Sequence, residues 1–137
     1  MTITYEWRGD IDDAALEALH AEGFGHHPFR RTAWRARLQR HSLGWVCAHE
    51  DGRLTGFVNV AWDGGVHAFL LDTVVAAAAR GRGVGAALVG AAAEGARDAG
   101  CEWLHVDFED HLRPFYAGAC GFADTSAGLL ALRRGEA

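Results

Sequence analysis

The sequence predicts an α/β domain with a mixed, mostly antiparallel sheet flanked by helices, in the order β-α-α-β-β-β-α-β-α-β. Two observations lead to this prediction. Runs of β-branched and aromatic residues alternate with turn residues in the first half of the chain, as is typical of strands and hairpins. Residues 84–99 instead place small apolar side chains at helical spacing. A chain of 137 residues has the length of one domain, so we expect a single domain over 1–137.

The N-terminal part predicts a strand followed by two helices. Residues 2–8 are rich in β-branched and aromatic types, and Asp10 or Asp12 is placed to cap the first helix. Residues 23–29 form a loop interrupted by two glycines and a proline. Thr32 is expected to cap the second helix, which ends near position 41.

The remaining elements follow from turn signals and periodicity. Turn residues separate three successive antiparallel strands, expected at 43–49, 54–62 and 66–75. The helix over 84–99 presents a stripe of small residues that lets it lie close to a sheet. A strand, a short helix and a final strand complete the order, at 102–108, 112–119 and 127–132.

Composition and charge narrow the class of protein. The net charge is -5 and all thirteen basic residues are arginine, which argues against a nucleic acid partner. No run approaches the roughly 20 apolar residues of a membrane span, and no signal peptide pattern opens the chain, so we expect a cytoplasmic protein. The three cysteines are far apart and form no CxxC pair, which predicts reduced thiols and no metal site; they are Cys47, Cys101 and Cys120.

A glycine-rich segment between a predicted strand and a predicted helix is the most informative feature. Residues 80–85 read Arg-Gly-Arg-Gly-Val-Gly. Glycines let backbone amides point into a common space, and a helix start adds unpaired N–H groups and a positive dipole end. Such a segment is suited to hold a pyrophosphate, with Arg80 and Arg82 adding positive charge.

The motif Arg80-x-x-Gly83-x-Gly85 resembles the coenzyme A-binding signature of the GCN5-related N-acetyltransferases (GNAT). A second segment, Phe115-Tyr116 followed after four residues by Gly121-Phe122, resembles a closing motif of the same family. The resemblance covers nearly the whole chain and implies a GNAT-like fold. It also implies transfer of an acetyl group from acetyl-CoA to a primary amine, by direct attack in a ternary complex.

The resemblance also implies roles for individual residues. Backbone groups at the end of the fourth strand would pair with the pantetheine arm of acetyl-CoA, and amides of the loop would hold its pyrophosphate. The coenzyme-binding residues implied are Thr73, Val74, Val75, Arg80, Gly81, Arg82, Gly83, Val84, Gly85 and Ala86. Tyr116 matches the tyrosine that protonates the leaving thiolate. Two positions depart from the family pattern, Ala77 in place of a proline and Glu109 in place of an asparagine.

The acceptor amine needs a proton acceptor, because a primary amine is mostly protonated at neutral pH. The candidates are Asp72 and Asp107, with Glu109, His67 and a water chain as alternatives. Aromatic residues that could line the acceptor pocket are His26, His27, Trp34, Trp45 and Trp62, although core packing is the ordinary role of a tryptophan. The acceptor is a small-molecule or peptide amine that the sequence does not specify, and a homodimer is left open.

Two other interpretations compete with this one. The glycines and an acidic residue about 20 positions later imitate a dinucleotide-binding fingerprint of an oxidoreductase. That fingerprint follows its strand at once, whereas five residues separate Val75 from Gly81. Too little chain follows for the parallel strands that a dinucleotide-binding domain needs. A non-catalytic acyl-CoA-binding module of the same fold is the second alternative, against which the presence of Tyr116 argues.

Overall fold

The computed structural model describes residues 2–29 and 32–134, and the chain divides into two compact units, residues 1–106 and 107–137. The first unit contains β1 (Ile3–Trp7), α1 (Asp13–Phe24), α2 (Trp34–His41), β2 (Ser42–Glu50), β3 (Arg53–Trp62), β4 (His67–Val75), the short 3₁₀ turn η1 (Ala77–Ala79), α3 (Val84–Asp98) and β5 (Trp103–His105). The second contains the turns η2 (Asp110–Leu112) and η3 (Pro114–Ala119). That residues 1–137 form a single domain stays a prediction.

The sheet has five strands in the order β1-β2-β3-β4-β5. The pairs β1–β2, β2–β3 and β3–β4 are antiparallel, and β5 pairs parallel to β4. The predicted mixed, mostly antiparallel sheet is therefore confirmed. A parallel partner for β4 requires a crossover connection, and α3 provides it.

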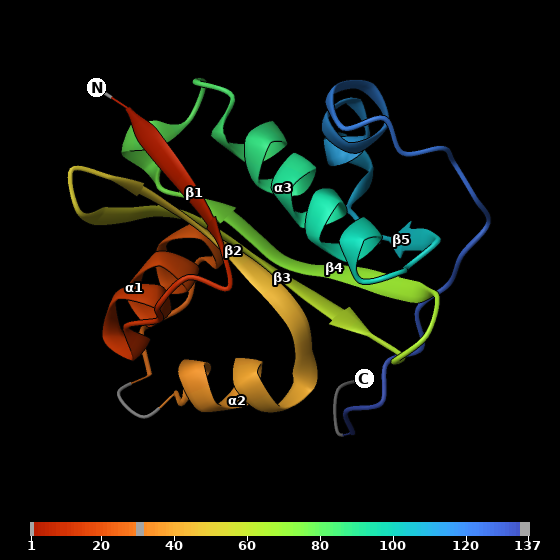
Figure 1. The fold of residues 1–137 in the computed structure, drawn as a ribbon, viewed down its shortest axis with the longest axis horizontal. Coiled ribbons are helices and arrows are strands. Elements are labelled where there is room, and N and C mark those ends of the chain that lie inside the picture. The colour runs from red at the N-terminus through yellow and green to blue at the C-terminus, as the bar shows by residue number, and fades with distance from the viewer. Residues whose placement is uncertain (1, 30–31, 135–137) are drawn as a thin grey trace. The chain divides into compact units, whose positions relative to one another are not determined.

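Helices cover both faces of this sheet, with α1 and α2 on one side and α3 on the other (Figure 1). Under α1 and α2, alternate strand residues join helix residues in one buried cluster, made of Ile11, Leu16, Leu19, Trp34, Leu38, Trp45, Cys47, Phe57 and Val74. On the other face α3 approaches closely, because a Cβ on Gly56 would lie 2.9 Å from Leu88. The small-residue stripe predicted for this helix thus has a packing role, and Glu94, Arg97 and Asp98 are exposed as expected.

The cap of α1 was predicted correctly, whereas the start of the loop after α1 and the cap of α2 were not. Asp12 caps α1, since its Oδ1 accepts from the N–H of Ala15 at 3.1 Å. The expected loop over 23–29 begins two residues late, because Gly23 stays helical where α1 crosses β4; a Cβ there would lie 2.2 Å from Val74. The prediction that Thr32 caps α2 is wrong, since Ala33 holds the cap position and the Thr32 side chain bonds to Glu17 instead.

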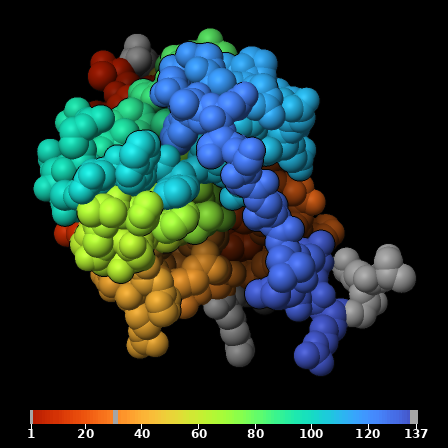
Figure 2. Space-filling view, turned by 90° about the vertical axis from the view of Figure 1, so that its right-hand side faces the viewer, coloured from red at the N-terminus to blue at the C-terminus, as the bar shows by residue number. Residues whose placement is uncertain are grey.

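The second unit differs most from prediction. The helix expected at 112–119 is split into η2 and η3, of which η3 winds as a wide π turn. The final strand expected at 127–132 is wrong, since residues 121–134 carry no regular structure, and Figures 1 and 2 draw this blue segment as an extended path. A strand needs a neighbouring strand for its backbone groups, and none of the five described strands forms a ladder with residues 127–132. The leucines of the predicted strand, Leu129, Leu130 and Leu132, are exposed.

No helix within the described ranges is long and apolar enough to cross a membrane.

Candidate active site

A β-bulge in β4 places Asp72 in a strained conformation. Leu71 pairs with Asn59 and Val74 with Phe57, so two residues of β4 face the single residue between these partners. Asp72 has φ 58°, a left-handed value that costs a non-glycine residue about 1–2 kcal/mol. Strain of this kind persists where the surrounding structure imposes it, and it clusters at functional sites.

The sheet opens next to this bulge. β5 pairs with β4 only from His67 to Phe69, so the β4 edge beyond Phe69 has no β5 partner among the described strands. The N–H of Ala76 donates to the carbonyl of Thr55 on β3 at 2.8 Å. Because peptide groups alternate along an antiparallel pair, those of Val75 then point away from β3 and those of Val74 toward it. The open edge therefore presents the N–H of Val75, whereas the carbonyl of Val75 accepts from Arg80 Nε at 3.3 Å.

The glycine segment leads from this edge into α3. Gly81 and Gly83 have φ 76° and 80°, and Gly83 is the N-cap of the 15-residue helix without a side-chain cap. A Cβ built at either glycine would meet nothing within 4 Å. Protein packing therefore does not require glycine here, whereas the left-handed backbone favours it, and the missing side chains leave the space beside the loop open. The uncapped helix start offers N–H groups suited to an anion.

Carboxylates on each side hold this connection in place. The Arg82 guanidinium donates to both oxygens of Glu50, at 3.1 and 2.6 Å, and the N–H of Ala77 donates to Glu22 at 2.8 Å. Arg80 instead reaches the carbonyl of Val75 at 3.3 Å and is exposed. The charge of Arg82 is therefore already paired, and Arg80 is the arginine available to an anion at the loop.

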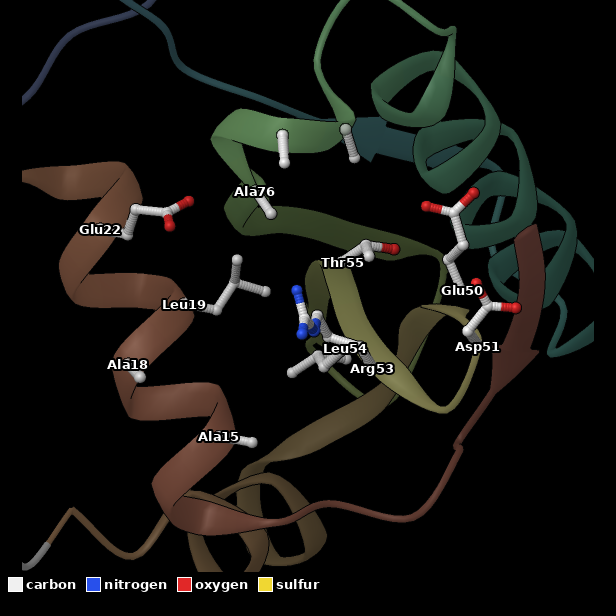
Figure 3. A pocket seen from close by; sticks show the side chains of 12 residues that line it. Ala15, Ala18, Leu19, Glu22, Glu50, Asp51, Arg53, Leu54, Thr55 and Ala76 are labelled. Carbon is white, nitrogen blue, oxygen red and sulfur yellow. The ribbon is translucent and has the colours of Figure 1, made fainter. Parts of the chain in front are cut away.

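Glu22 and Glu50 also line an open cavity of about 590 Å³ between α1 and the β2–β3 turn. In Figure 3 the α1 side chains face this turn across the cavity, with Ala76 along one side. Arg53 lines the same cavity. Glu22 and Glu50 both accept hydrogen bonds from the connection between β4 and α3. Their negative charges make this cavity unsuited to a diphosphate.

A second cavity, of about 430 Å³, lies between α2 and the strands at the bulge. Asp72 lines it together with polar residues from α2 and β3, and the full lining is Arg37, Leu38, His41, Ser42, Asn59, Ala61, Leu71 and Asp72. Asn59 is buried and accepts from the Ser42 hydroxyl at 2.6 Å, while Arg37 lies over the Trp34 ring at 4.0 Å. Asp72 is the acidic side chain of this lining.

A histidine of α1 contacts Asp72, and a histidine of the loop after α1 contacts the first histidine. His20 Nε2 lies 3.1 Å from Asp72 Oδ1, and His20 Nδ1 lies 2.7 Å from His26 Nε2. His20 was not among the predicted site residues. Nothing in the spacing of a single helix histidine indicates a partner 52 positions away on a strand, so only the fold could reveal it.

The buried carboxylate of Glu17 organises the loop between α1 and α2. It accepts from Trp34 Nε1 at 2.9 Å and from the N–H of Phe29 at 3.0 Å. Burial acts to raise the pKa of Glu17, but the hydrogen bonds from Phe29, Trp34 and Thr32 outweigh it, and the pKa lies below its usual value. Glu17 therefore stays charged, 3.9 Å from His26 Nδ1.

The aromatic residues predicted for the acceptor pocket do not line the cavity at Asp72, and their role at an acceptor stays a prediction. Trp34 and Trp45 are buried in the core, and Trp45 donates to the Gly9 carbonyl at 2.8 Å. Trp62 lies at the end of β3, and none of the five predicted aromatic residues lines the cavity at Asp72. His67, an alternative base, contacts His105 at 2.9 Å near the start of β4.

Tyr116 and Asp107 belong to the second unit. The Tyr116 ring is buried and contacts Phe108, Phe115 and Phe122, with centroid distances of 5.0, 4.8 and 5.9 Å. Glu109 is exposed and pairs with His111. The catalytic roles of Asp107 and Tyr116 stay predictions.

The cysteines are all free, as predicted. Burial, with the charges of Glu6 and Asp10, raises the pKa of Cys47 to about 12. Burial also raises the pKa of Cys101 and Cys120. A thiolate nucleophile is therefore disfavoured at all three positions. Among residues 2–29 and 32–134, no group of three or more potential ligands could hold a metal ion.

Residues 6–122 match the acetyltransferase (GNAT) family. The chain belongs to this family. The predicted resemblance is confirmed, and the fold agrees with it, since a solved putative acetyltransferase from Agrobacterium tumefaciens superimposes with a TM-score of 0.83. That structure is 24% identical and is covered to 99% of its length, with 95% of this chain.

Two curated GNAT-like relatives are similar in sequence. A mycothiol acetyltransferase of Nocardia farcinica is 35% identical over 112 residues, which cover 77% of this chain and 37% of the relative. A probable glucosamine 6-phosphate N-acetyltransferase of Oryza sativa subsp. japonica is 44% identical over 61 residues, 44% of this chain and 36% of the relative. The chain thus spans little more than a third of the length of each of these relatives.

Proposed function

We propose that this GNAT-family chain is an N-acetyltransferase that transfers an acetyl group from acetyl-CoA to a primary amine by direct attack in a ternary complex. The observation that carries the proposal is the open edge of β4 leading into the uncapped N-terminus of α3 through glycines whose Cβ positions face empty space. A ligand with an extended arm and a diphosphate has this outline. Both curated relatives are named as acetyltransferases.

The coenzyme side of the site is made mainly of backbone. The outward N–H of Val75 and the peptide groups of Thr73, two residues earlier, would pair with the amides of the pantetheine arm, as in strand addition. Val74 contributes packing, since its side chain is buried. The amides of residues 81–86 would hold the diphosphate, with Arg80 beside them as the unpaired positive charge.

On the acceptor side, Asp72 is the base that we assign. Its carboxylate lines the cavity of about 430 Å³, and its side chain remains 28% exposed. Asp107 is retained as the second candidate for this role. Tyr116 is proposed to protonate the departing thiolate, because a phenol and a thiol have similar basicity.

The acceptor is proposed to be a small polar amine or a peptide amine, in the cytoplasm, with no nucleic acid or membrane partner. The net charge of -5 and the polar cavity at Asp72 support an amine. A homodimer is compatible with the proposal and is not required by it.

The experiment is thiol release from acetyl-CoA across a panel of primary amines that includes glucosamine 6-phosphate, with calorimetric binding of acetyl-CoA and of NAD measured in parallel. We expect acetyl-CoA to bind, NAD not to bind, and one amine class to release thiol. Binding of acetyl-CoA without thiol release from any amine would instead favour a non-catalytic acyl-CoA-binding module. Binding of NAD in place of acetyl-CoA would favour the dinucleotide alternative.

A further inference from the structure

The contacts around His20 form a continuous array from the cavity to the protein surface. Asp72 Oδ1 lies 3.1 Å from His20 Nε2, His20 Nδ1 lies 2.7 Å from His26 Nε2, and His26 Nδ1 lies 2.8 Å from the carbonyl of His27. The exposed fraction of the side chain is 18% for His20 and 30% for His26. The array therefore begins at a cavity-lining carboxylate and ends at a solvent-accessible ring.

The protons that these contacts require can be counted. A carbonyl oxygen only accepts, so the contact with His27 places a proton on His26 Nδ1. The contact between the rings holds a second proton, and the contact between His20 and Asp72 holds a third. Two neutral imidazoles and a carboxylate carry only two protons together. The fully bonded array thus holds one additional proton.

Without that proton, one contact of the array has no hydrogen. If the missing hydrogen is the one between His20 and Asp72, a ring lone pair faces a carboxylate oxygen at 3.1 Å, which is repulsive. A proton arriving at Asp72 restores the contact, and exchange along the two rings moves the charge to His26. The array is therefore built to accept one proton at the cavity and release one at the surface.

The charged groups around the array favour this direction. Glu17 on α1 is buried and lies 3.9 Å from His26 Nδ1, so it stabilises positive charge at the surface end. Arg37 of α2 lines the cavity with Asp72 and raises the positive potential there, and His41 of the same helix also lines it. The rings are held in position by aromatic neighbours, since His20 lies 4.4 Å from the Phe24 ring and 5.2 Å from the Trp34 ring.

We infer that Asp72, His20 and His26 form a proton relay that removes the proton of the acceptor ammonium from the cavity and delivers it to solvent. This inference rests on the proposed N-acetyltransferase function. His20 and His26 have positioning and proton-conducting roles, and Asp72 is the group that contacts the acceptor.

The protons balance over one turnover. The amine nitrogen attacks the thioester carbonyl carbon, the N–C bond forms, and the C–S bond breaks with its electron pair leaving on sulfur. An alkylammonium carries three N–H protons and the amide product carries one. One of the two lost protons ends on the thiol, and the other leaves through Asp72, His20 and His26.

The test compares two acceptors that differ in the need for this relay. The first is the best alkylamine of the panel, and the second is the O-alkylhydroxylamine with the same carbon skeleton, whose nitrogen is largely unprotonated at neutral pH. In His20→Asn we expect kcat/KM to fall about 100-fold for the alkylamine and to change only about two-fold for the hydroxylamine. His26→Asn, at the exposed end, should show the same pattern more weakly, and His49→Asn on β2 is the matched control.

The outcomes separate the relay from the function. If wild-type protein acetylates both probes and His20→Asn slows them equally, or slows neither, the relay is refuted while the proposed function stands. If wild-type protein acetylates no amine, the proposed function falls and the relay falls with it. Should His20→Asn not fold, as judged by thermal unfolding and acetyl-CoA affinity, His26→Asn decides by the same comparison.

A direct readout uses the full chain with ¹⁵N-labelled histidine. Long-range ¹H–¹⁵N spectra should place one proton on His26 Nδ1 and one between the two rings. A His26 ring protonated only at Nε2 would overturn the proton count.

Discussion

Arg82 and Glu50 form a two-point ion pair across the glycine segment, with donor–acceptor distances of 3.1 and 2.6 Å. The hydrogen bonds from Arg82 lower the pKa of Glu50, and those to Glu50 raise the pKa of Arg82. The pair therefore stays charged over the whole working range of pH. It fixes the loop to the end of β2 and at the same time neutralises one of its two arginines.

The first prediction concerns this neutralised charge. Glu50→Gln removes one negative charge next to the proposed diphosphate site and frees Arg82 to contact the ligand. We expect acetyl-CoA to bind about three- to ten-fold more tightly at low salt, with the gain shrinking as salt screens the interaction. Calorimetric titration at two ionic strengths measures this, with Glu94→Gln on α3 as control. Weaker binding would mean that the pair serves mainly to order the loop.

The second prediction uses two glycines with the same backbone conformation. Gly83 and Gly64 both have φ 80° and empty space at the Cβ position, but Gly64 lies in the β3–β4 turn. Alanine at either position should cost about 1–2 kcal/mol of stability from left-handed strain. Only Gly83→Ala should weaken acetyl-CoA binding, and Gly83→Glu should abolish it through added negative charge.

Chemical denaturation and calorimetry on the four variants, with alanine and glutamate at each position, check this pair. Unchanged acetyl-CoA affinity in Gly83→Glu would place the diphosphate elsewhere. Loss of affinity in Gly64→Glu as well would mean that the effect is not specific to the loop.

The fold was largely predictable because each element has a local signal. Strand composition, turn residues and the small-residue stripe of 84–99 indicate elements without knowledge of their partners. The strand predicted at 127–132 failed for the opposite reason, since strand formation depends on a pairing edge that composition cannot report.

The glycine loop is easier to recognise from the sequence than the contacts around Asp72. The loop at 80–85 is contiguous in sequence, whereas the array at Asp72 joins residues from α1, β4 and the loop after α1. The bulge at Asp72 and the pairing of Arg82 with Glu50 are equally non-local. Sequence reasoning could name Asp72 but could not find His20, and it counted Arg82 as a free charge.

The third prediction separates the role of the Tyr116 hydroxyl from that of its ring. Tyr116→Phe keeps the contacts with Phe108, Phe115 and Phe122, so the fold should be retained. We expect kcat to fall about 100-fold, as is typical on loss of a general acid, with acetyl-CoA affinity nearly unchanged. Steady-state kinetics and calorimetry test this, and Tyr5→Phe is the control. Full activity in Tyr116→Phe would remove the tyrosine from the mechanism.

The fourth prediction is that no cysteine takes part in the transfer. The pKa of Cys47 is about 12 and those of Cys101 and Cys120 are raised, so the reactive thiolate is scarce at neutral pH. Cys101→Ala and Cys120→Ala should keep wild-type turnover, and iodoacetamide should not inactivate the enzyme within the time of an assay. Rapid inactivation, or an acetylated cysteine detected by mass spectrometry, would contradict direct attack.

The fifth prediction concerns acid stability and follows from Glu17. Its pKa is lowered in the folded chain, so the carboxylate stabilises the fold above the unfolded-state pKa, near 4.5. This stabilisation is lost as the pH falls from about that value through the lower folded-state pKa.

Glu17→Gln replaces an acceptor of the Phe29 and Trp34 N–H groups by a group that is also a donor, which should cost about 1–3 kcal/mol at pH 7. The stability of this variant should also fall less than that of the wild type between pH 5 and pH 3, because one carboxylate with a lowered pKa is gone. Urea denaturation at several pH values measures both effects, with the exposed Glu94→Gln as control. An equal acid-induced loss in Glu17→Gln and wild type would show that the charge of Glu17 does not hold the loop between α1 and α2 in place.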